Sequence, residues 1–121
     1  MKVTGINPTL QVYDLKVAAD FYTTLGFKLE WLWPDDTPTH GSVSSNGHSF
    51  MLAKIDKAEK PEIGDLYFRV DGVEELYNEL KSKNIEVSRL EKTAYGMLDF
   101  SVNDPYGHHL VFGEPSGEWE G

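Results

Sequence analysis

Residues 103–112 read Asn-Asp-Pro-Tyr-Gly-His-His-Leu-Val-Phe, and this stretch predicts a β-hairpin. Asp104 can accept hydrogen bonds from the backbone ahead of it, and Pro105 presets the first dihedral angle of a turn. Gly107 adopts a left-handed conformation at no steric cost. One strand therefore enters a tight turn here, and a second strand returns from it.

The two strands of this hairpin carry different residues on their two faces. One face is apolar: Phe100, Val102, Leu110 and Phe112. The other face is mixed: Asp99, Ser101, His109 and Val111. A strand pair with this pattern indicates a sheet with a core behind it and a ligand-sized surface in front.

The chain nearly repeats its own pattern after 58 residues. The shift places Leu10 on Phe68, Val12 on Val70, Tyr22 on Leu80 and Phe27 on Ile85. Each half reads strand, helix, strand, with strands expected at 9–13 and 66–70 and helices at 17–25 and 73–83. Gly26 and Asn84 can supply left-handed helix ends, and the third segment of the second half contains Ile85 and Val87.

Two further strands are expected in each half, near 41–45 and 49–55 and near 95–103 and 109–113. The repeat predicts an α+β fold of paired βαβββ modules whose sheets curl around a shared cleft. A chain of 121 residues is one domain by size. We expect a first module at 1–55, a second at 64–114 and a tail at 115–121 with Trp119 as its only possible anchor.

Composition narrows the possible partners. The formal charge of -9 disfavours nucleic acid and anionic membrane surfaces and mildly favours a cationic ligand, although it can equally be ordinary solubility charge. The absence of cysteine excludes disulfides, thiolate nucleophiles and thiolate zinc sites. The first residues lack the apolar run of a signal peptide, and no segment approaches membrane-spanning length, so we expect a cytoplasmic protein.

The hairpin is accompanied by Leu10-Gln11-Val12-Tyr13-Asp14-Leu15, Phe21-Tyr22 and Leu25-Gly26-Phe27. Together these motifs, which span nearly the whole chain, resemble the vicinal-oxygen-chelate superfamily of glyoxalases, ring-cleaving dioxygenases and bleomycin-resistance proteins. The resemblance implies the paired βαβββ architecture. It also implies four possible metal-ligand positions, on the first and last strands of each module.

Those four positions are occupied here by Asn7, Met51, Asp65 and Val111. Only Asp65 is an ordinary ligand for a divalent ion, because a thioether is soft, an amide binds weakly and valine has no donor atom. We therefore expect no metal and no other cofactor. An alternative metal set is His109 with Asp65 and Asp99, although the sequence has no paired histidine spacing.

Catalysis without metal needs a tuned acid and base, and Asp99 and His109 on adjacent strands form a candidate pair for proton transfer. Cross-strand polar pairs also serve structure or ligand binding. His108 is expected to be a solvent-exposed turn residue. His40 and His48 fall in expected loops, and the stretch 33–40, with two prolines and two aspartates, is expected to be irregular.

The alternation predicts an amphipathic cleft wall with aromatic residues near its mouth, suited to a planar or cationic small molecule. Its expected members are Asn7, Thr9, Gln11, Trp31, Trp33, Met51, Asp65, Tyr67, Arg69, Asp99, Ser101, His109 and Val111. In the alternative interpretation the tryptophan and tyrosine side chains fill core volume.

Within the superfamily the chain is most similar to the bleomycin-resistance branch, whose members lack metal, tend to be acidic and dimerise, often by exchange of an N-terminal strand. Pro8, six residues before Asp14, matches a proline common in that branch. Arg69 departs from it, because a cation in the cleft would oppose a strongly cationic drug. The leading hypothesis is a metal-free, homodimeric protein that sequesters an aromatic or cationic compound. The alternative is a lyase, isomerase or dioxygenase with an unconventional metal site.

Overall fold

The computed structural model describes residues 1–117, so Trp119 and the end of the expected tail lie outside the described residues. The chain forms two compact units that divide between Ile63 and Gly64. We refer to them as the first and the second unit and describe each by itself.

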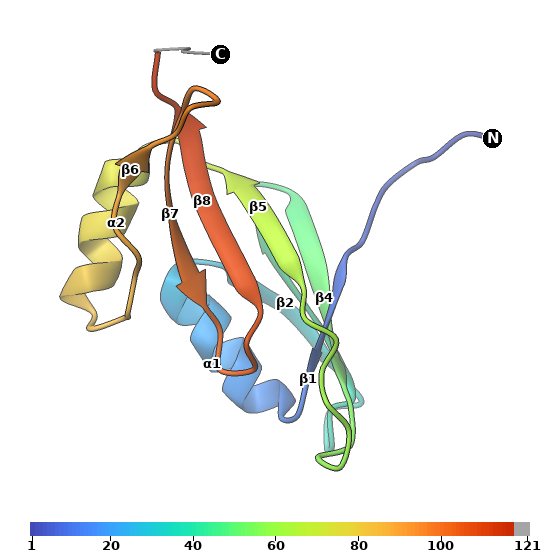
Figure 1. Ribbon diagram of the computed structural model, residues 1–121. Coiled ribbons are helices and arrows are strands. Elements are labelled where there is room, and N and C mark those ends of the chain that lie inside the picture. The colour runs from blue at the N-terminus through green and yellow to red at the C-terminus, as the bar shows by residue number, and fades with distance from the viewer. Residues whose placement is uncertain (118–121) are drawn as a thin grey trace. The chain divides into compact units, whose positions relative to one another are not determined.

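The first unit contains one helix and a four-stranded sheet (Figure 1). Its elements are β1 (Thr9–Val12), α1 (Leu15–Leu25), β2 (Lys28–Trp33), β3 (His40–Ser45) and β4 (His48–Lys54). The strand order is β1-β4-β3-β2, with β1 parallel to β4 and the other neighbours antiparallel.

The second unit repeats this topology. Its elements are β5 (Asp65–Arg69), α2 (Val73–Ser82), β6 (Glu91–Lys92), β7 (Met97–Asn103) and β8 (His109–Pro115). The strand order is β5-β8-β7-β6, with β5 parallel to β8. The α+β fold of two βαβββ modules expected from the repeat is therefore confirmed.

One expected strand is largely missing from the second unit. Residues 85–90 contain no strand, and β6 is only two residues long. Ser88 explains the break: its amide donates to the carbonyl of Ser101, but its hydroxyl, rather than a carbonyl, accepts from the amide of Ser101. A side chain that takes a place in the hydrogen-bond ladder interrupts regular pairing. The expectation of a strand containing Ile85 and Val87 is wrong for this reason.

The two helices begin in different ways. In α1 the Asp14 carboxylate accepts from the amides of Lys16 and Val17, which is ordinary N-capping. In α2 the capping residue is Gly72, which has no side chain, and Glu114 from β8 accepts from the amide of Gly72 instead. Within residues 1–117, neither helix is long and apolar enough to cross a membrane.

Both helices end as the sequence predicts. Gly26 has φ of 119° after α1, and Asn84 has φ of 61° after α2. Glycine and asparagine are the residues that tolerate this left-handed region most readily. The left-handed turn stops the helix and redirects the chain toward the sheet.

Each unit has its own core between helix and sheet. In the first unit Tyr22 is buried against Phe27 and Phe50, with ring centroids 6.1 and 5.2 Å away. In the second unit the expected inner face is buried: Phe100, Val102, Leu110 and Phe112. Full burial of such side chains stabilises a fold by about 1.5 to 3 kcal/mol each. Because the inner face of each sheet supplies this stabilisation, the side chains of the opposite face can serve binding.

The hairpin between β7 and β8 has the expected turn. Gly107 has φ of 91°, and its amide donates to the carbonyl of Asp104 at 3.1 Å. The Asp104 carboxylate accepts from the amides of Tyr106 and His108 at 2.8 and 2.9 Å. The turn prediction is confirmed in its mechanism as well as in its place.

The expectation that His108 is solvent-exposed is wrong. Its side chain is 0% exposed, and its Nδ1 accepts from the amide of Gly64 at 2.9 Å. The reason is the parallel pairing of β5 with β8, which brings the start of β5 against the returning strand. The expected loop positions of His40 and His48 are also wrong, since these exposed residues are the first of β3 and β4.

Candidate functional site

Strand register places the expected side chains of the second unit on one face. Residues paired across neighbouring strands share a face of the sheet, and so do residues two apart on one strand. One row joins Asp65, His109 and Asn103, the next joins Tyr67, Val111 and Ser101, and the third joins Arg69, Gly113, Asp99 and Glu91. All seven residues expected on this outer face therefore lie on it.

A shallow cavity of about 340 Å³ lies on this face. Six of the seven expected residues line it: Asp65, Tyr67, Asp99, Ser101, His109 and Val111. Arg69 shares the face but is not among the residues that line the cavity. Arg89 lines the cavity in its place and Glu91 adds a carboxylate, so the cavity is more acidic than the sequence pattern alone predicts.

The sequence pattern did not predict five of the residues that line the cavity: Ser88, Arg89, Glu91, Tyr95 and Phe100, the last of which was expected on the inner face only. Glu91 pairs with Asp99 across β6 and β7, so continued alternation could have found it. Tyr95 precedes Gly96, which has φ of 82°, in the turn that leads into β7. The sequence signal for Tyr95 was its place just before a turn glycine, at the start of a strand that carries polar residues on its outer face.

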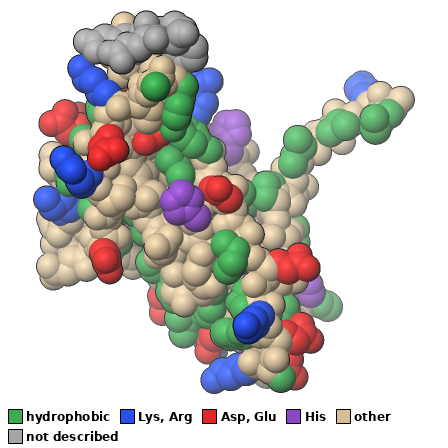
Figure 2. Space-filling view, in the orientation of Figure 1, with side chains coloured by type: hydrophobic (Ala, Val, Ile, Leu, Met, Phe, Trp, Pro, Cys, Tyr) green, Lys and Arg blue, Asp and Glu red, His purple; other side chains and the backbone are tan. Residues whose placement is uncertain are grey.

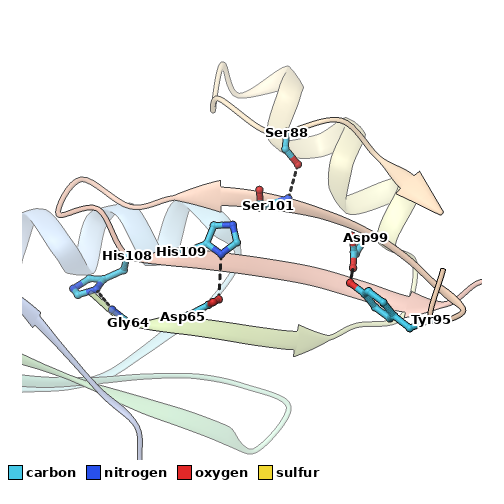
Figure 3. A network of polar contacts seen from close by, with 8 residues as sticks. All are labelled: Gly64, Asp65, Ser88, Tyr95, Asp99, Ser101, His108 and His109. Carbon is cyan, nitrogen blue, oxygen red and sulfur yellow. Dashed lines mark hydrogen bonds and ion pairs between the residues drawn. The ribbon is translucent and has the colours of Figure 1, made fainter. Parts of the chain in front are cut away.

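One end of the cavity holds a histidine and aspartate pair (Figure 3). His109 Nδ1 lies 3.1 Å from Asp65 Oδ1. A carboxylate only accepts hydrogen bonds, so Nδ1 carries the proton and Nε2 becomes the acceptor of the neutral ring. In the space-filling view a histidine lies beside an acidic side chain on the face formed by β5 and β8 (Figure 2).

The other end of the cavity holds a carboxylate between two phenols. Asp99 Oδ2 accepts hydrogen bonds from the hydroxyls of Tyr67 at 3.0 Å and Tyr95 at 2.8 Å. The candidate Asp99 and His109 pair for proton transfer is therefore not formed, because the carboxylate of Asp99 accepts from the tyrosines and the imidazole of His109 contacts Asp65. Asp99 and His109 lie on the same face of the sheet, but their side chains have different partners.

The environment of the two phenols favours their protonated form. Burial, followed by the hydrogen bond to Asp99, raises the pKa of Tyr67. The hydrogen bond to Asp99 is the main cause that raises the pKa of Tyr95. Both tyrosines are thus neutral hydrogen-bond donors at neutral pH.

Gly113 makes this arrangement possible. A Cβ atom at this position would collide with the hydroxyl of Tyr67 and would lie 2.9 Å from the Cβ of Asp99. The ring of Tyr67 therefore lies across β8 where the strand has no side chain. Glycine inside a strand often marks such a close approach.

The first unit presents a corresponding face with different side chains. One row joins Thr9, Met51, Ser42 and Trp31, and the next joins Gln11, Ala53, His40 and Trp33. Trp31 and Trp33 are 44% and 64% exposed, so the alternative in which they fill core volume is wrong.

Asn7 and Gln11, both expected in the cleft wall, differ from the expectation in strand position and in side-chain partner. Asn7 precedes β1 and is exposed, so it does not lie on the first strand. The side-chain oxygen of Gln11 accepts from the amide of Glu62 at 2.8 Å, which ties the linker to β1. Sequence alternation gave the correct face for Gln11 but not the backbone partner that uses its side chain.

The residues do not fit a divalent metal. Of the four family positions, only Asp65 offers a good ligand, and its carboxylate contacts His109. Within residues 1–117, no three His, Asp or Glu side chains gather closely enough to hold an ion. The alternative set of His109, Asp65 and Asp99 is therefore not formed, because Asp99 lies in the tyrosine cluster.

The sequence profile of the Glyoxalase/Bleomycin resistance protein/Dioxygenase superfamily matches residues 5–112, and the chain belongs to this superfamily. Among curated proteins, no sequence matches the chain. Its fold is similar to that of TnmS3, an antibiotic binding protein from Streptomyces sp. CB03234, with TM-score 0.74, 23% identity and coverage of 96% of this chain and 100% of that one.

Two further solved structures show how varied the relatives of this fold are. A bleomycin-binding protein complexed with bleomycin matches with TM-score 0.74 and 20% identity over 93% of this chain and 98% of that one. Lactoylglutathione lyase from Agrobacterium tumefaciens matches with TM-score 0.74 and 18% identity over 94% and 96%. At these identities the likeness establishes the fold, and function has to be argued from the site.

Proposed function

We propose that the protein binds a small organic molecule with an aromatic or cationic group and works without a metal ion or other cofactor. The observation that carries this proposal is the cavity of the second unit. Its polar ends, the Asp65 and His109 pair and the Asp99 cluster, are already oriented by hydrogen bonds within the protein. Groups held in place before binding lose little conformational entropy when a ligand arrives.

The donor chemistry of the family positions supports a metal-free protein. Met51 and Val111 stand where carboxylates would complete an oxygen-rich site. The similar structures whose names specify antibiotic or bleomycin binding support a small-molecule ligand. The proposed ligand is bound, not transformed.

A ligand screen combined with metal analysis tests the proposal. The purified protein is titrated with neutral, cationic and anionic aromatic compounds while backbone amide resonances are recorded. We expect saturable shifts on β5, β7 and β8 from some compounds, and less than stoichiometric nickel, zinc, manganese or iron by elemental analysis. About one tightly held metal per chain, or no compound that perturbs this face, would contradict the proposal.

A glyoxalase-like or dioxygenase-like enzyme with an unconventional metal site is the second candidate. The Asp65 and His109 pair favours it, since a carboxylate that orients an imidazole is common around metal ligands and in general base catalysis. Addition of divalent metal followed by an activity screen separates the two candidates. Turnover that depends on metal and is lost in His109→Gln would favour the enzyme.

We also propose a cytoplasmic homodimer. The chain before β1 exposes large apolar side chains, Met1, Val3 and Ile6, in a segment without strand or helix (Figure 1). A second copy can cover such an arm, and Pro8 stiffens its base. Light scattering at micromolar concentration should give twice the chain mass of 13.7 kDa, and the double variant Val3→Asp, Ile6→Asp should lower it. A monomer mass for the unmodified chain would refute this assembly.

A further inference from the structure

We propose that Tyr67, Tyr95 and Asp99 form a subsite for a nitrogen cation that carries N–H groups, such as an ammonium, amidinium or guanidinium. This inference rests on the proposed function and names the ligand group that the cavity selects. Figure 3 shows Asp99 and Tyr95 at the end of the face away from the His109 and Asp65 pair.

The first argument is the use of the carboxylate oxygens. Both phenol hydroxyls donate to Oδ2 of Asp99, at 3.0 and 2.8 Å. Neither hydroxyl donates to Oδ1 of Asp99, so this oxygen can accept hydrogen bonds from a ligand. An ionised carboxylate accepts up to about four hydrogen bonds in total, so the remaining capacity is large.

The second argument is the direction of the hydrogen bonds. Each phenol spends its single proton on Asp99, so toward the cavity its oxygen offers lone pairs only. Because both phenols have raised pKa values, this pattern does not reverse near neutral pH. Everything the cluster presents to a ligand is an acceptor, so the ligand group must be a donor with several protons.

The third argument is charge. Within residues 1–117, no Lys, Arg or His forms an ion pair with Asp99. The cavity-lining Arg89 is 90% exposed and lies 3.9 Å from Glu91, which partly balances it. A carboxylate held only by neutral hydroxyls is completed by a cation, and charge-assisted hydrogen bonds are about twice as strong as neutral ones.

The fourth argument is that the fold is adapted to hold the cluster. Gly113 removes the side chain that would block the hydroxyl of Tyr67. The turn that carries Tyr95 is fixed as well, because the amide of Met97 donates to the hydroxyl of Thr93 and the amide of Ser116 donates to the carbonyl of Gly96. Tyr67 and Tyr95 act as positioning residues, and Asp99 makes the contact.

The test uses three probes that share a benzene ring: benzamidine, benzyltrimethylammonium and benzyl alcohol. Benzamidine offers charge and N–H donors, the quaternary compound offers charge alone, and the alcohol is neutral. Their affinities for the full chain are measured from amide chemical shifts. We expect benzamidine to bind about tenfold or more tightly than the other two, the factor expected for charge-assisted hydrogen bonds.

Variants locate the effect. Asp99→Asn should weaken benzamidine binding about tenfold or more, and Tyr95→Phe several-fold, by loss of orientation of the carboxylate. Arg69→Gln should strengthen binding slightly by removing a like charge from the same face. Asp71→Asn, an exposed carboxylate outside the cavity, is the matched control and should leave the affinity unchanged.

Equal binding of benzamidine and benzyltrimethylammonium, or an unchanged affinity in Asp99→Asn, would overturn the inference. The proposed function would survive that result if neutral or anionic aromatic compounds still shifted the amides of β7 and β8. Failure of every compound to perturb the face would defeat the proposed function itself, so the two failures are distinguishable. Tyr95→Phe removes only an exposed hydroxyl, and so it keeps the test valid if Asp99→Asn folds poorly.

Discussion

The outer faces of the two units have the same strand order and comparable register but carry different side chains. The central position of one row is apolar in both, Met51 in the first unit and Val111 in the second. On the neighbouring parallel strand, Thr9 pairs with Met51 in the first unit, whereas Tyr67 pairs with Val111 in the second. The aromatic residue of this row in the first unit is Trp31, on the edge strand β2. The βαβββ backbone therefore determines where side chains point, while the residue at each position decides what the face can bind.

The edge strands explain much of this difference. β2 is six residues long and holds two exposed tryptophans, and its pairing with β3 continues to Trp33 after a register shift between Leu29 and Trp31. The corresponding segment of the second unit pairs only at Glu91 and Lys92, and Ser88 interrupts the ladder before it. The longer edge strand therefore carries two aromatic side chains, whereas the two-residue edge strand lies beside the cavity of the second unit.

The hairpins differ as well, and their difference yields the largest predicted effect. The β3–β4 turn uses Asn46 and Gly47 with φ of 51° and 80° in an exposed position. The β7–β8 turn buries Asp104, whose carboxylate satisfies the amides of Tyr106 and His108. Asp104→Ala should destabilise the protein by about 2 to 4 kcal/mol, because buried donors lose their acceptor.

Asn46→Gly is the matched change in the first unit. Glycine adopts the left-handed conformation of Asn46 without strain, so this variant should shift stability by less than about 0.5 kcal/mol. Urea unfolding followed by circular dichroism compares the two variants. Similar midpoints would show that the buried turn does not anchor the second unit.

The next effect concerns the glycine in each sheet. Gly113→Ala should destabilise by about 1 to 2 kcal/mol, since the new methyl group displaces the hydroxyl of Tyr67 from Asp99. In Gly41→Ala the nearest atom is the Cδ2 of Leu32 at 2.9 Å, the flexible end of an aliphatic side chain that can shift. The first unit should therefore lose packing only, and the second should lose packing and a polar contact.

Amide and tyrosine resonances separate these outcomes. In Gly113→Ala the resonances of Tyr67 and Tyr95 should both change, because the two hydroxyls share one carboxylate oxygen. Gly41→Ala should leave them unaltered. A Gly113→Ala variant with an intact tyrosine signature would mean that the close approach at β8 does not position the cluster.

Sequence patterns were sufficient for the fold and for the face of each strand. The period-two alternation around Phe100 and Phe112 gave the buried side, and turn chemistry at Asp104 gave the hairpin. Patterns of this kind are local, so the chain carries them without knowledge of tertiary contacts. Both helix ends, at Gly26 and Asn84, follow from the same local logic.

Side-chain partners were harder to predict, because they depend on residues far apart in the chain. His108 is buried because β5 pairs in parallel with β8. This pairing brings Gly64, which is 44 residues earlier in the chain, against the imidazole of His108. Asp99 binds Tyr67 across a strand that a glycine leaves open. Alternation states which face a side chain occupies, but not which of several neighbours it reaches.

A smaller effect concerns how the free energy of unfolding depends on pH in the alkaline range. The folded-state pKa of Tyr67 and of Tyr95 is raised, so the folded protein holds these protons more tightly than the unfolded chain. Their contribution to stability is complete below about pH 10, the ordinary tyrosine value, and is lost as pH rises through the folded-state pKa. Stability should therefore decline above about pH 10 more steeply in the unmodified chain than in Tyr67→Phe.

Ultraviolet titration of tyrosinate gives an independent reading of the same cluster. Asp99→Asn removes the carboxylate that raises both pKa values, so the late part of the titration should move to lower pH. Asp71→Asn should leave the curve in place. An unchanged curve in Asp99→Asn would place the cause of the shift elsewhere in the second unit.

The smallest predicted effect concerns the aromatic face of the first unit and its part in ligand binding. Trp31 and Trp33 are both exposed, and Trp31 shares its face with Thr9 and Met51. A ligand that stacks there should quench tryptophan emission, and Trp31→Phe should weaken an aromatic ligand by about 0.5 to 1.5 kcal/mol, the usual gain from an aromatic pair. A Trp119→Phe background restricts the signal to these two residues. Benzamidine that binds through Asp99 with unchanged emission and unchanged affinity in Trp31→Phe would mean that the charged face of the second unit binds alone, and that the aromatic face of the first unit has another role.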